Sequence, residues 1–351
     1  MPFELNAKIK NLTPYDPIEG SFRIRLDANE SFLSPNAQMM EKIAAAVQNV
    51  DFNRYPDARA AELCGSFAKV YGLNPQHITA ANGSDELLSL IVQSFLQKGD
   101  TLLTMEPDFS MYRFYGALSE ANVITVKKNA DFTPDFEELA AQAKAQNARI
   151  ILFSNPCNPT SVGVGRAAIL KLIAETDALV VVDEAYMDFF GDSILNEVPS
   201  YDNLIVLRTC SKAIGLASLR LGFAVANPAL TKVLHAVKSP YNVNAVSQAI
   251  GVALLEEKTY IQRGVKQIIA SRDELLAQMQ ELCGKIPQQL AVCGADANFL
   301  FCRAEKAGEA FRFLMERGII VRHMGEFLRI TAGRNHENAE VVRELAAFYM
   351  K

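Results

Sequence analysis

The sequence predicts an α/β protein, with a mainly parallel sheet between helices in a large domain and a smaller α+β domain after it. Three observations lead to this prediction: near-continuous apolar runs, helical periodicity between them, and a change of pattern after residue 282. Short apolar runs separated by helices are typical of parallel strands that are buried on both faces. With 351 residues, half of them hydrophobic, the chain is long enough for two or three domains.

The expected elements follow in chain order. Residues 1–35 contain Pro14, Pro17, Gly20 and Pro35 and predict an irregular N-terminal arm. Helices are expected over 57–71, 85–97, 135–147 and 165–176, and strands of the large sheet over 101–105, 123–126, 149–154, 178–183, 204–207 and 221–226. One long or broken helix over 243–282 leads to strands over 298–302, 319–322 and 327–331 and helices near 305–317 and 336–350. We therefore divide the chain into residues 1–35 (arm and part of the small domain), 36–242 (large domain) and 243–351 (small domain).

Composition excludes several classes of function. The net charge is −5 with no basic block, which argues against nucleic acid or an anionic membrane as the main partner. The N-terminus lacks the pattern of a signal peptide, and no apolar run reaches the roughly 20 residues that span a bilayer. Six cysteines without a C-x-x-C pair are expected to be free and mostly buried, and four dispersed histidines do not suggest a metal site. A cytoplasmic location is the expectation.

The segment 209–220 contains the residues that most suggest chemistry. It follows the strand expected over 204–207 and places Lys212 at the edge of a sheet, where a lysine is seldom found without a role. The hydroxyls of Thr209 and Ser211 and the guanidinium of Arg220 suit a phosphate dianion. A lysine beside such a site suggests a phosphorylated carbonyl cofactor that is held as a Schiff base. From this segment alone, a P-loop-like phosphate site or a surface Ser–Lys pair explains the pattern equally well.

Two turns near strand ends add candidate binding groups. Gly83 allows a sharp turn into the helix expected over 85–97, and the backbone N–H groups from Gly83 to Asp85, with Ser84 between them, would form an anion site. An ordinary helix N-cap accounts for the same residues. Two Asn-Pro steps within 155–159 form a stiff turn that would direct the Asn158 amide toward the sheet edge, although a purely structural turn explains them as well.

Two further strands end in, or contain, a charged side chain. Asp183 ends an apolar run, and a buried carboxylate there needs a cationic partner, for which a protonated pyridine nitrogen would serve. Tyr186 follows and could reach a phenolic oxygen. An Asp that binds magnesium in a nucleotide site is the alternative, but the sequence contains no G-x-x-x-x-G-K-[ST] motif. Arg329 lies in an alternating strand and suits a carboxylate, with Arg322 and Arg334 as nearby competitors.

In their order and combination, these residues resemble the fold-type-I pyridoxal-phosphate aminotransferases; they are Asn158, Asp183, Tyr186, Lys212, Arg220 and Arg329. The sequence more closely resembles the histidinol-phosphate aminotransferase group of class II. The resemblance covers nearly the whole chain, from segments 12–15, 26–30 and 53–57 to 328–331. It implies a large-domain sheet of the seven-stranded type, pyridoxal 5'-phosphate as cofactor, and ping-pong amino transfer between histidinol phosphate, or a related amine or amino acid, and 2-oxoglutarate.

The resemblance also implies how the cofactor is held. Lys212 would carry it as a Schiff base and then move the substrate proton, and Asp183 would pair with the ring nitrogen. Asn158 and Tyr186 would contact the ring 3-oxygen. By these roles, Lys212, Asp183 and Tyr186 are the catalytic candidates. Phe109 would stack on the ring. The phosphate-binding candidates are Gly83, Ser84, Asp85, Ser211 and Arg220.

The same resemblance implies a substrate end and a partner. Tyr15, Asn158 and Arg329 would bind the substrate, with Arg329 gripping its carboxylate or phosphate. Tyr55 would reach the cofactor phosphate of a neighbouring subunit, which implies a homodimer with shared active sites.

The sequence departs from the family pattern in three places, of which the first two change backbone freedom and the third leaves the substrate open. Ser161 and Ser218 stand where glycine is common, and the segment 321–327 is short and lacks the second Asp-Arg-type pair often found there. A threonine-phosphate decarboxylase-like enzyme and an aromatic amino acid aminotransferase are therefore alternatives within the cofactor class. A non-catalytic nucleotide-binding α/β module is the alternative outside it.

Overall fold

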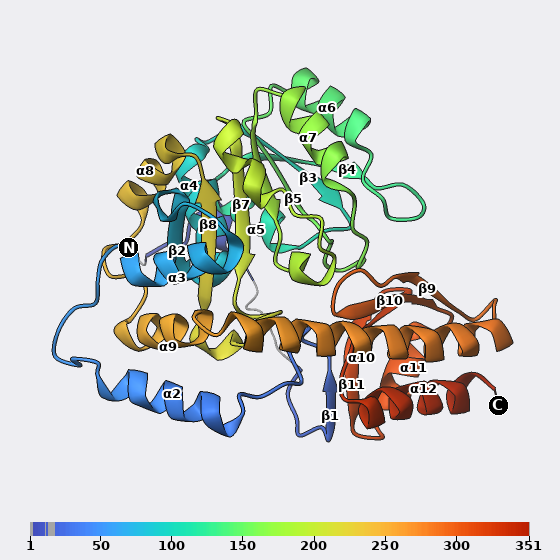
Figure 1. Cartoon of the computed structure of the whole chain (residues 1–351). Helices are drawn as coiled ribbons and strands as arrows, with labels where there is room; N and C mark the ends of the chain where they lie inside the picture. The colour runs from blue at the N-terminus through green and yellow to red at the C-terminus, as the bar shows by residue number, and fades with distance from the viewer. Residues whose placement is uncertain (1–2, 11, 13–17, 351) are drawn as a thin grey trace.

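The computed structural model describes residues 3–10, 12 and 18–350. Within these residues the backbone forms a seven-stranded and a five-stranded sheet (Figure 1). The large sheet has the order β2-β8-β7-β6-β5-β3-β4, with bounds β2 Ile78–Asn82, β3 Thr101–Glu106, β4 Asn122–Lys127, β5 Ile150–Ser154, β6 Leu179–Asp183, β7 Leu204–Thr209 and β8 Leu221–Ala226. The small sheet has the order β1-β11-β12-β10-β9, with bounds β1 Ile24–Leu26, β9 Leu290–Gly294, β10 Phe299–Ala304, β11 Ile319–Met324 and β12 Phe327–Thr331. The predicted α/β fold class is confirmed.

The large sheet is mixed because one strand reverses direction. Strands β3 to β7 pair in parallel, whereas β8 is antiparallel to both β7 and β2. Only residues 210–220 join β7 to β8, and a parallel crossover needs a dozen or more residues, so the chain turns back on itself. Thr209 at the end of β7 consequently lies opposite Gly222 near the start of β8. The turn between them carries Lys212.

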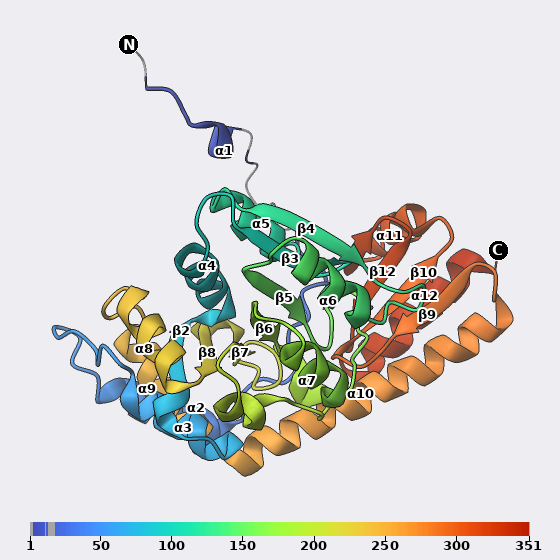
Figure 2. The ribbon, with the colours of Figure 1, turned by 90° about the horizontal axis from the view of Figure 1, so that it is seen from above.

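Helices cover both faces of the large sheet. One face of the sheet buries Phe153 and Val182 against α3, α6 and α7, and the other buries Leu152 and Val181 against α4, α5 and α8. Figure 2 shows α4 and α5 on the opposite side of the strands from α6 and α7. Burial on both faces explains why β5 and β6 are apolar up to their last residues. The helix bounds are α1 Ala7–Lys10, α2 Ala37–Gln48, α3 Ala61–Tyr71, α4 Gly83–Phe95, α5 Met111–Leu118, α6 Phe136–Ala145, α7 Arg166–Ala174 and α8 Pro228–Val237.

The helix expected over 243–282 is broken in two. α9 (Ala245–Leu255) begins after Asn244, whose side chain accepts a hydrogen bond from Ser247 N, and α10 (Lys258–Lys285) follows after two residues. α10 runs alongside both sheets (Figure 1), because Ile261 packs in the core of the large sheet and Leu275 in that of the small sheet. α11 (Ala307–Met315) and α12 (Asn335–Tyr349) complete the small α+β unit.

Several expectations about single elements were wrong. Residues 1–35 are not wholly irregular, because β1 pairs in parallel with β11 of the small sheet. The helix expected from residue 57 begins at Ala61, because the Asp57 carboxylate accepts a hydrogen bond from Ala61 N at 2.7 Å and holds the preceding residues in a turn. Besides β1, the α-helices and strands that were not expected are α1, α2, α5, α8, β2 and β9.

Two kinds of feature are absent from the described part of the chain. No helix there is both long and apolar enough to cross a membrane. The same residues contain no group of three or more His, Cys, Asp or Glu side chains arranged to hold a metal ion.

Candidate active site

A cavity of about 650 Å³ opens where the carboxyl ends of the parallel strands face the small sheet. Strands β3, β5, β6 and β7 each contribute lining residues at or just after their last residue, as expected for an α/β sheet. Arg322 and Met324 on β11 and Arg329 on β12 line the opposite wall. The sequence-predicted residues found in the lining are Ser84, Asp85, Phe109, Asn158, Asp183, Tyr186, Ser211, Lys212, Arg220 and Arg329.

Lys212 projects into this cavity from the turn between β7 and β8. Its Nζ donates a hydrogen bond to the carbonyl of Ala28 at 3.1 Å and lies 5.7 Å from the centroid of the Tyr186 ring. The turn is held at its base, because Cys210 N donates to Leu221 O at 2.9 Å. A primary amine is thus presented to the cavity by a turn whose two ends are hydrogen-bonded together.

Asp183 lines the cavity and is buried, with 5% of the residue exposed. Oδ2 accepts a hydrogen bond from the Tyr112 hydroxyl at 2.9 Å, and Oδ1 accepts one from Ala185 N at 3.1 Å. Burial raises the pKa of Asp183 to about 7, although these two hydrogen bonds lower it. Among the described residues, no lysine or arginine forms an ion pair with this carboxylate. The site therefore suits a ligand that brings a cationic group to Asp183.

An anion-binding cradle lies at the N-terminus of α4. Its first residue, Gly83, has φ +79°, and a Cβ there would meet Arg220 Nη2 at 2.8 Å, so only glycine fits. Arg220 Nη1 donates to Ser211 Oγ at 3.3 Å, and Nη2 contacts Asp85 Oδ2 at 3.4 Å. Gly222 lets β8 approach the start of α4 closely, since a Cβ at that position would lie 2.3 Å from Ser84 N. Helix N–H groups, a hydroxyl and a guanidinium together suit a phosphate.

Polar side chains also join the two walls of the cavity. Arg329 donates to Asn158 Oδ1 at 2.5 Å through Nη1 and to the carbonyl of Asp27 at 2.7 Å through Nη2. The Tyr186 hydroxyl accepts a hydrogen bond from Asn29 Nδ2 at 2.9 Å. Asn158 and Tyr186 flank the same space as Lys212, and Arg329 marks a cationic end. A ligand held here would meet an amine, a carboxylate, an anion cradle and an arginine.

A comparison with known protein families agrees with this geometry. The model of the family described as "Aminotransferase class I and II" matches residues 23–345. The chain belongs to this aminotransferase family. The matched range includes both sheets and every predicted site residue except Tyr15.

Curated relatives of this aminotransferase extend over its full length. A histidinol-phosphate aminotransferase from Clostridium kluyveri is 36% identical over 343 residues, which cover 96% of each chain. One from Clostridium novyi is 38% identical and covers 95% of this chain and 94% of its own. One from Pyrococcus furiosus is 34% identical and covers 97% of both.

Solved structures share the fold of this aminotransferase. The histidinol-phosphate aminotransferase of Sinorhizobium meliloti, in complex with pyridoxal-5'-phosphate, superposes with a TM-score of 0.86 at 22% identity, over 98% of this chain and 96% of that one. The L-threonine-O-3-phosphate decarboxylase of Porphyromonas gingivalis superposes with a TM-score of 0.79 at 22% identity, over 93% of this chain and 100% of that one. At such identities, these structures establish the fold.

Among the predicted residues that the structure describes, Tyr55 and Gly83 do not line the cavity. Tyr55 is 81% exposed and stacks on Tyr241, with ring centroids 4.6 Å apart. Tyr15 lies outside the described residues. Gly83 lies beside the lining residue Ser84, at a position where a Cβ would meet Arg220.

Sequence reasoning missed Tyr112, which is fully buried and hydrogen-bonded to Asp183. Tyr112 follows Phe109 by three residues at the start of α5, and the two rings meet edge to face with centroids 5.6 Å apart. Because α5 was not among the expected elements, no helical face was available to place Tyr112 beside Phe109. Burial raises the pKa of Tyr112 well above its ordinary value, so its hydroxyl stays protonated and donates.

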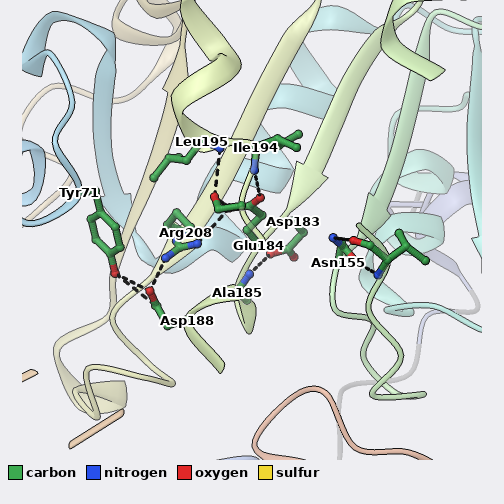
Figure 3. A network of polar contacts seen from close by, with 11 residues as sticks. Tyr71, Asn155, Asp183, Glu184, Ala185, Asp188, Ile194, Leu195 and Arg208 are labelled. Carbon is green, nitrogen blue, oxygen red and sulfur yellow. Dashed lines mark hydrogen bonds and ion pairs between the residues drawn. The ribbon is translucent and has the colours of Figure 1, made fainter. Parts of the chain in front are cut away.

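A buried network behind the site fixes the ends of β6 and β7 (Figure 3). Arg208 Nη1 donates to Glu184 Oε2 at 3.0 Å, and Nη2 donates to Asp188 Oδ1 at 2.5 Å. Glu184 Oε1 also accepts a hydrogen bond from Ile194 N at 2.9 Å, and the Tyr71 hydroxyl lies 3.2 Å from the Asp188 carboxylate. Breaking such a buried pair costs about 3–5 kcal/mol. The network therefore holds in place the two strand ends that present the carboxylate and the amine.

Proposed function

We propose that the chain is a pyridoxal 5'-phosphate-dependent aminotransferase that transfers the amino group between histidinol phosphate and 2-oxoglutarate. The observation that carries the proposal is Asp183, a buried carboxylate that shares one cavity with the Lys212 amine and the cradle at Arg220. A protonated pyridine nitrogen supplies the cation that Asp183 lacks among the described side chains. Full-length relatives that are 34–38% identical and named histidinol-phosphate aminotransferase support the donor.

Each residue of the cavity would have a definite task. The cofactor, when bound, supplies an electron sink for a carbanion at the substrate Cα. Asp183 would hold a proton on the ring nitrogen, and the Lys212 amine would take the proton from the substrate Cα. Asn158 and Tyr186 would contact the ring 3-oxygen, and Phe109 would cover the ring face. Ser84, Asp85, Ser211 and Arg220 would hold the phosphate beside Gly83.

The opposite wall would bind the anionic end of both substrates. Arg322 and Arg329 are Cα partners across β11 and β12, and both line the cavity. The guanidinium fork of arginine pairs with a phosphate as well as with a carboxylate. The same wall could thus receive the phosphate of the donor in one half-reaction and a carboxylate of 2-oxoglutarate in the other.

The decisive experiment is a donor panel assayed against 2-oxoglutarate with the cofactor-loaded protein. We expect glutamate to form with histidinol phosphate faster than with aromatic amino acids. Release of carbon dioxide from threonine phosphate without amino transfer would instead identify a decarboxylase. Lys212→Ala should abolish turnover and prevent borohydride from fixing the cofactor to the chain, while the circular dichroism spectrum stays unchanged. A colourless protein that takes up no cofactor would contradict the whole proposal.

We also propose a homodimer in the cytoplasm. Tyr55 and Tyr241 form an exposed stack, and Phe52, three residues before Tyr55 in the chain, is 74% exposed. Tyr55 would complete the phosphate cradle of the second subunit. Sedimentation equilibrium should give about twice the chain mass of 38.6 kDa. A monomer that is fully active would exclude the shared site. The domain boundaries at 35/36 and 242/243 remain a prediction, which limited proteolysis would test.

A further inference from the structure

Lys128 is a buried lysine that the proposed chemistry does not use. It follows β4, and its side chain is 1% exposed, as is that of Asp108, its ion-pair partner at 3.4 Å. Burial lowers the pKa of Lys128, but Asp108 and Cys157 raise it, and the balance lies above the ordinary value. Burial and then the Asp108 charge raise the pKa of Cys157, so its thiol stays neutral. Asp108 is therefore the counter-ion of Lys128.

Asp108 connects this buried lysine to the cavity wall. Its Oδ1 accepts a hydrogen bond from Phe109 N at 2.8 Å and another from the Ser154 hydroxyl. Ser154 Oγ in turn accepts a hydrogen bond from Asn158 N at 3.3 Å, and Asn158 Oδ1 accepts the Arg329 guanidinium. The contacts form one continuous polar chain between the large sheet and the small sheet.

Because these contacts are continuous, the position of Arg329 depends on the ion pair between Lys128 and Asp108. The Asn158 loop receives Arg329 across the gap between the sheets, and its backbone is held by Ser154, which Asp108 orients. A buried carboxylate without its cation is strongly unfavourable, so Asp108 would not keep this arrangement if Lys128 were neutral.

We propose that Lys128 is a positioning residue for the substrate-anion end of the site, acting on Arg329 through Asp108, Ser154 and Asn158. The inference rests on the proposed function only for the identity of the anions. Lys128 itself does not line the cavity, so its effect should fall on anion binding and less on the cofactor.

The test uses the cofactor-loaded protein and measures the dissociation constants of succinate and inorganic phosphate from changes in cofactor absorbance. Lys128→Met should weaken binding of both anions about tenfold or more, because it leaves the buried Asp108 carboxylate without its cation. The dissociation constant of the cofactor should change less than threefold. The matched control is Lys127→Met, which removes the exposed neighbouring lysine and should change neither constant.

Three further variants separate positioning from damage to the fold. Lys128→Met combined with Asp108→Asn removes both buried charges but keeps an acceptor for Phe109 N and Ser154, so anion binding should return to within about threefold of the parent. Ser154→Ala interrupts the chain without leaving a charge unpaired and should reproduce the loss even if Lys128→Met does not fold. In an Arg329→Gln background, Lys128→Met should add little further loss, because coupled residues are not additive.

Two results would overturn the inference: unchanged anion binding in Ser154→Ala, or a Lys128→Met loss that is equally large with and without Arg329. Neither depends on turnover. Failure of the proposed function would appear separately, as a parent protein that binds these anions but transfers no amino group from histidinol phosphate.

Discussion

At the scale of the residue, Asp183 is governed by a competition between burial and contacts. Removal from water opposes its ionisation, whereas the hydroxyl of Tyr112 and the amide of Ala185 favour it. Burial prevails, and the carboxylate becomes a group that a cationic ligand would stabilise strongly. The stability and the cofactor affinity of the protein should both report this balance.

Replacing Asp183 by Asn should stabilise the cofactor-free protein at alkaline pH. Since the folded-state pKa of about 7 exceeds the ordinary 3.8, stability due to Asp183 is fully present below pH 4 and is lost as pH rises toward 7. In urea titrations at pH 8, the free energy of unfolding of Asp183→Asn should therefore exceed that of the parent by up to about 4 kcal/mol. The difference should be smaller at pH 5. Asp202→Asn, at an exposed position, is the control and should show no such trend.

Removing the Tyr112 hydroxyl should weaken cofactor binding. In Tyr112→Phe, Asp183 loses the hydrogen bond that lowers its pKa, so it is ionised less readily and pairs less well with a cation. Loss of about 1.4 kcal/mol would raise the cofactor dissociation constant about tenfold, as measured by fluorescence titration. Tyr201→Phe removes a hydroxyl elsewhere and should leave the constant unchanged; an equal effect there would refute the assignment.

At the scale of the element, the sequence predicts where strands lie better than it predicts the contacts between distant segments. Six strands of the large sheet were predicted from their apolar runs, which are largely buried in every case except the edge strand β4. Strand β2 was not predicted, since Ala80 and Ala81 have little strand propensity. Asp183 is the last residue of β6, and Lys212 follows the end of β7 by three residues. The contact between Asn158 and Arg329 joins segments that are 171 residues apart, which no local pattern contains.

The close approach of β8 to α4 should be sensitive to a single methyl group. A Cβ in Gly222→Ala would lie 2.3 Å from the Gly83 backbone, so the start of α4 must move away from Arg220. We expect a loss of roughly 1–3 kcal/mol in thermal unfolding together with weaker cofactor binding. Gly65→Ala on α3 meets no atom within 4 Å and should instead be neutral or stabilising by up to about 1 kcal/mol.

At the scale of the whole molecule, the two sheets are joined by the loop that follows β5. Ser161 in this loop is fully buried with φ +55°, and its hydroxyl donates to Phe299 O at 2.8 Å and accepts from Ala297 N at 2.9 Å. The serine that departs from the family pattern thus makes contacts that glycine could not. It anchors the Asn158 loop to the small sheet.

Two substitutions of Ser161 should separate hydrogen bonding from backbone strain. Ser161→Ala removes both hydrogen bonds and keeps an unfavourable left-handed conformation, whereas Ser161→Gly removes them and relieves about 1–2 kcal/mol of that strain. Melting temperatures should therefore fall in the order parent, Ser161→Gly, Ser161→Ala. If the glycine variant melted above the parent, the hydroxyl contacts would contribute less than the strain.

The 28-residue α10 has a consequence for how the molecule comes apart. At about 1.5 Å per residue it is some 42 Å long, and its apolar stripe is divided between two cores. Ile261 belongs to the core of the large sheet, while Leu275, Met279 and Leu282 belong to that of the small sheet. If either core unfolded, the apolar side chains on one half of α10 would be exposed to water. Both cores should therefore unfold in a single cooperative transition.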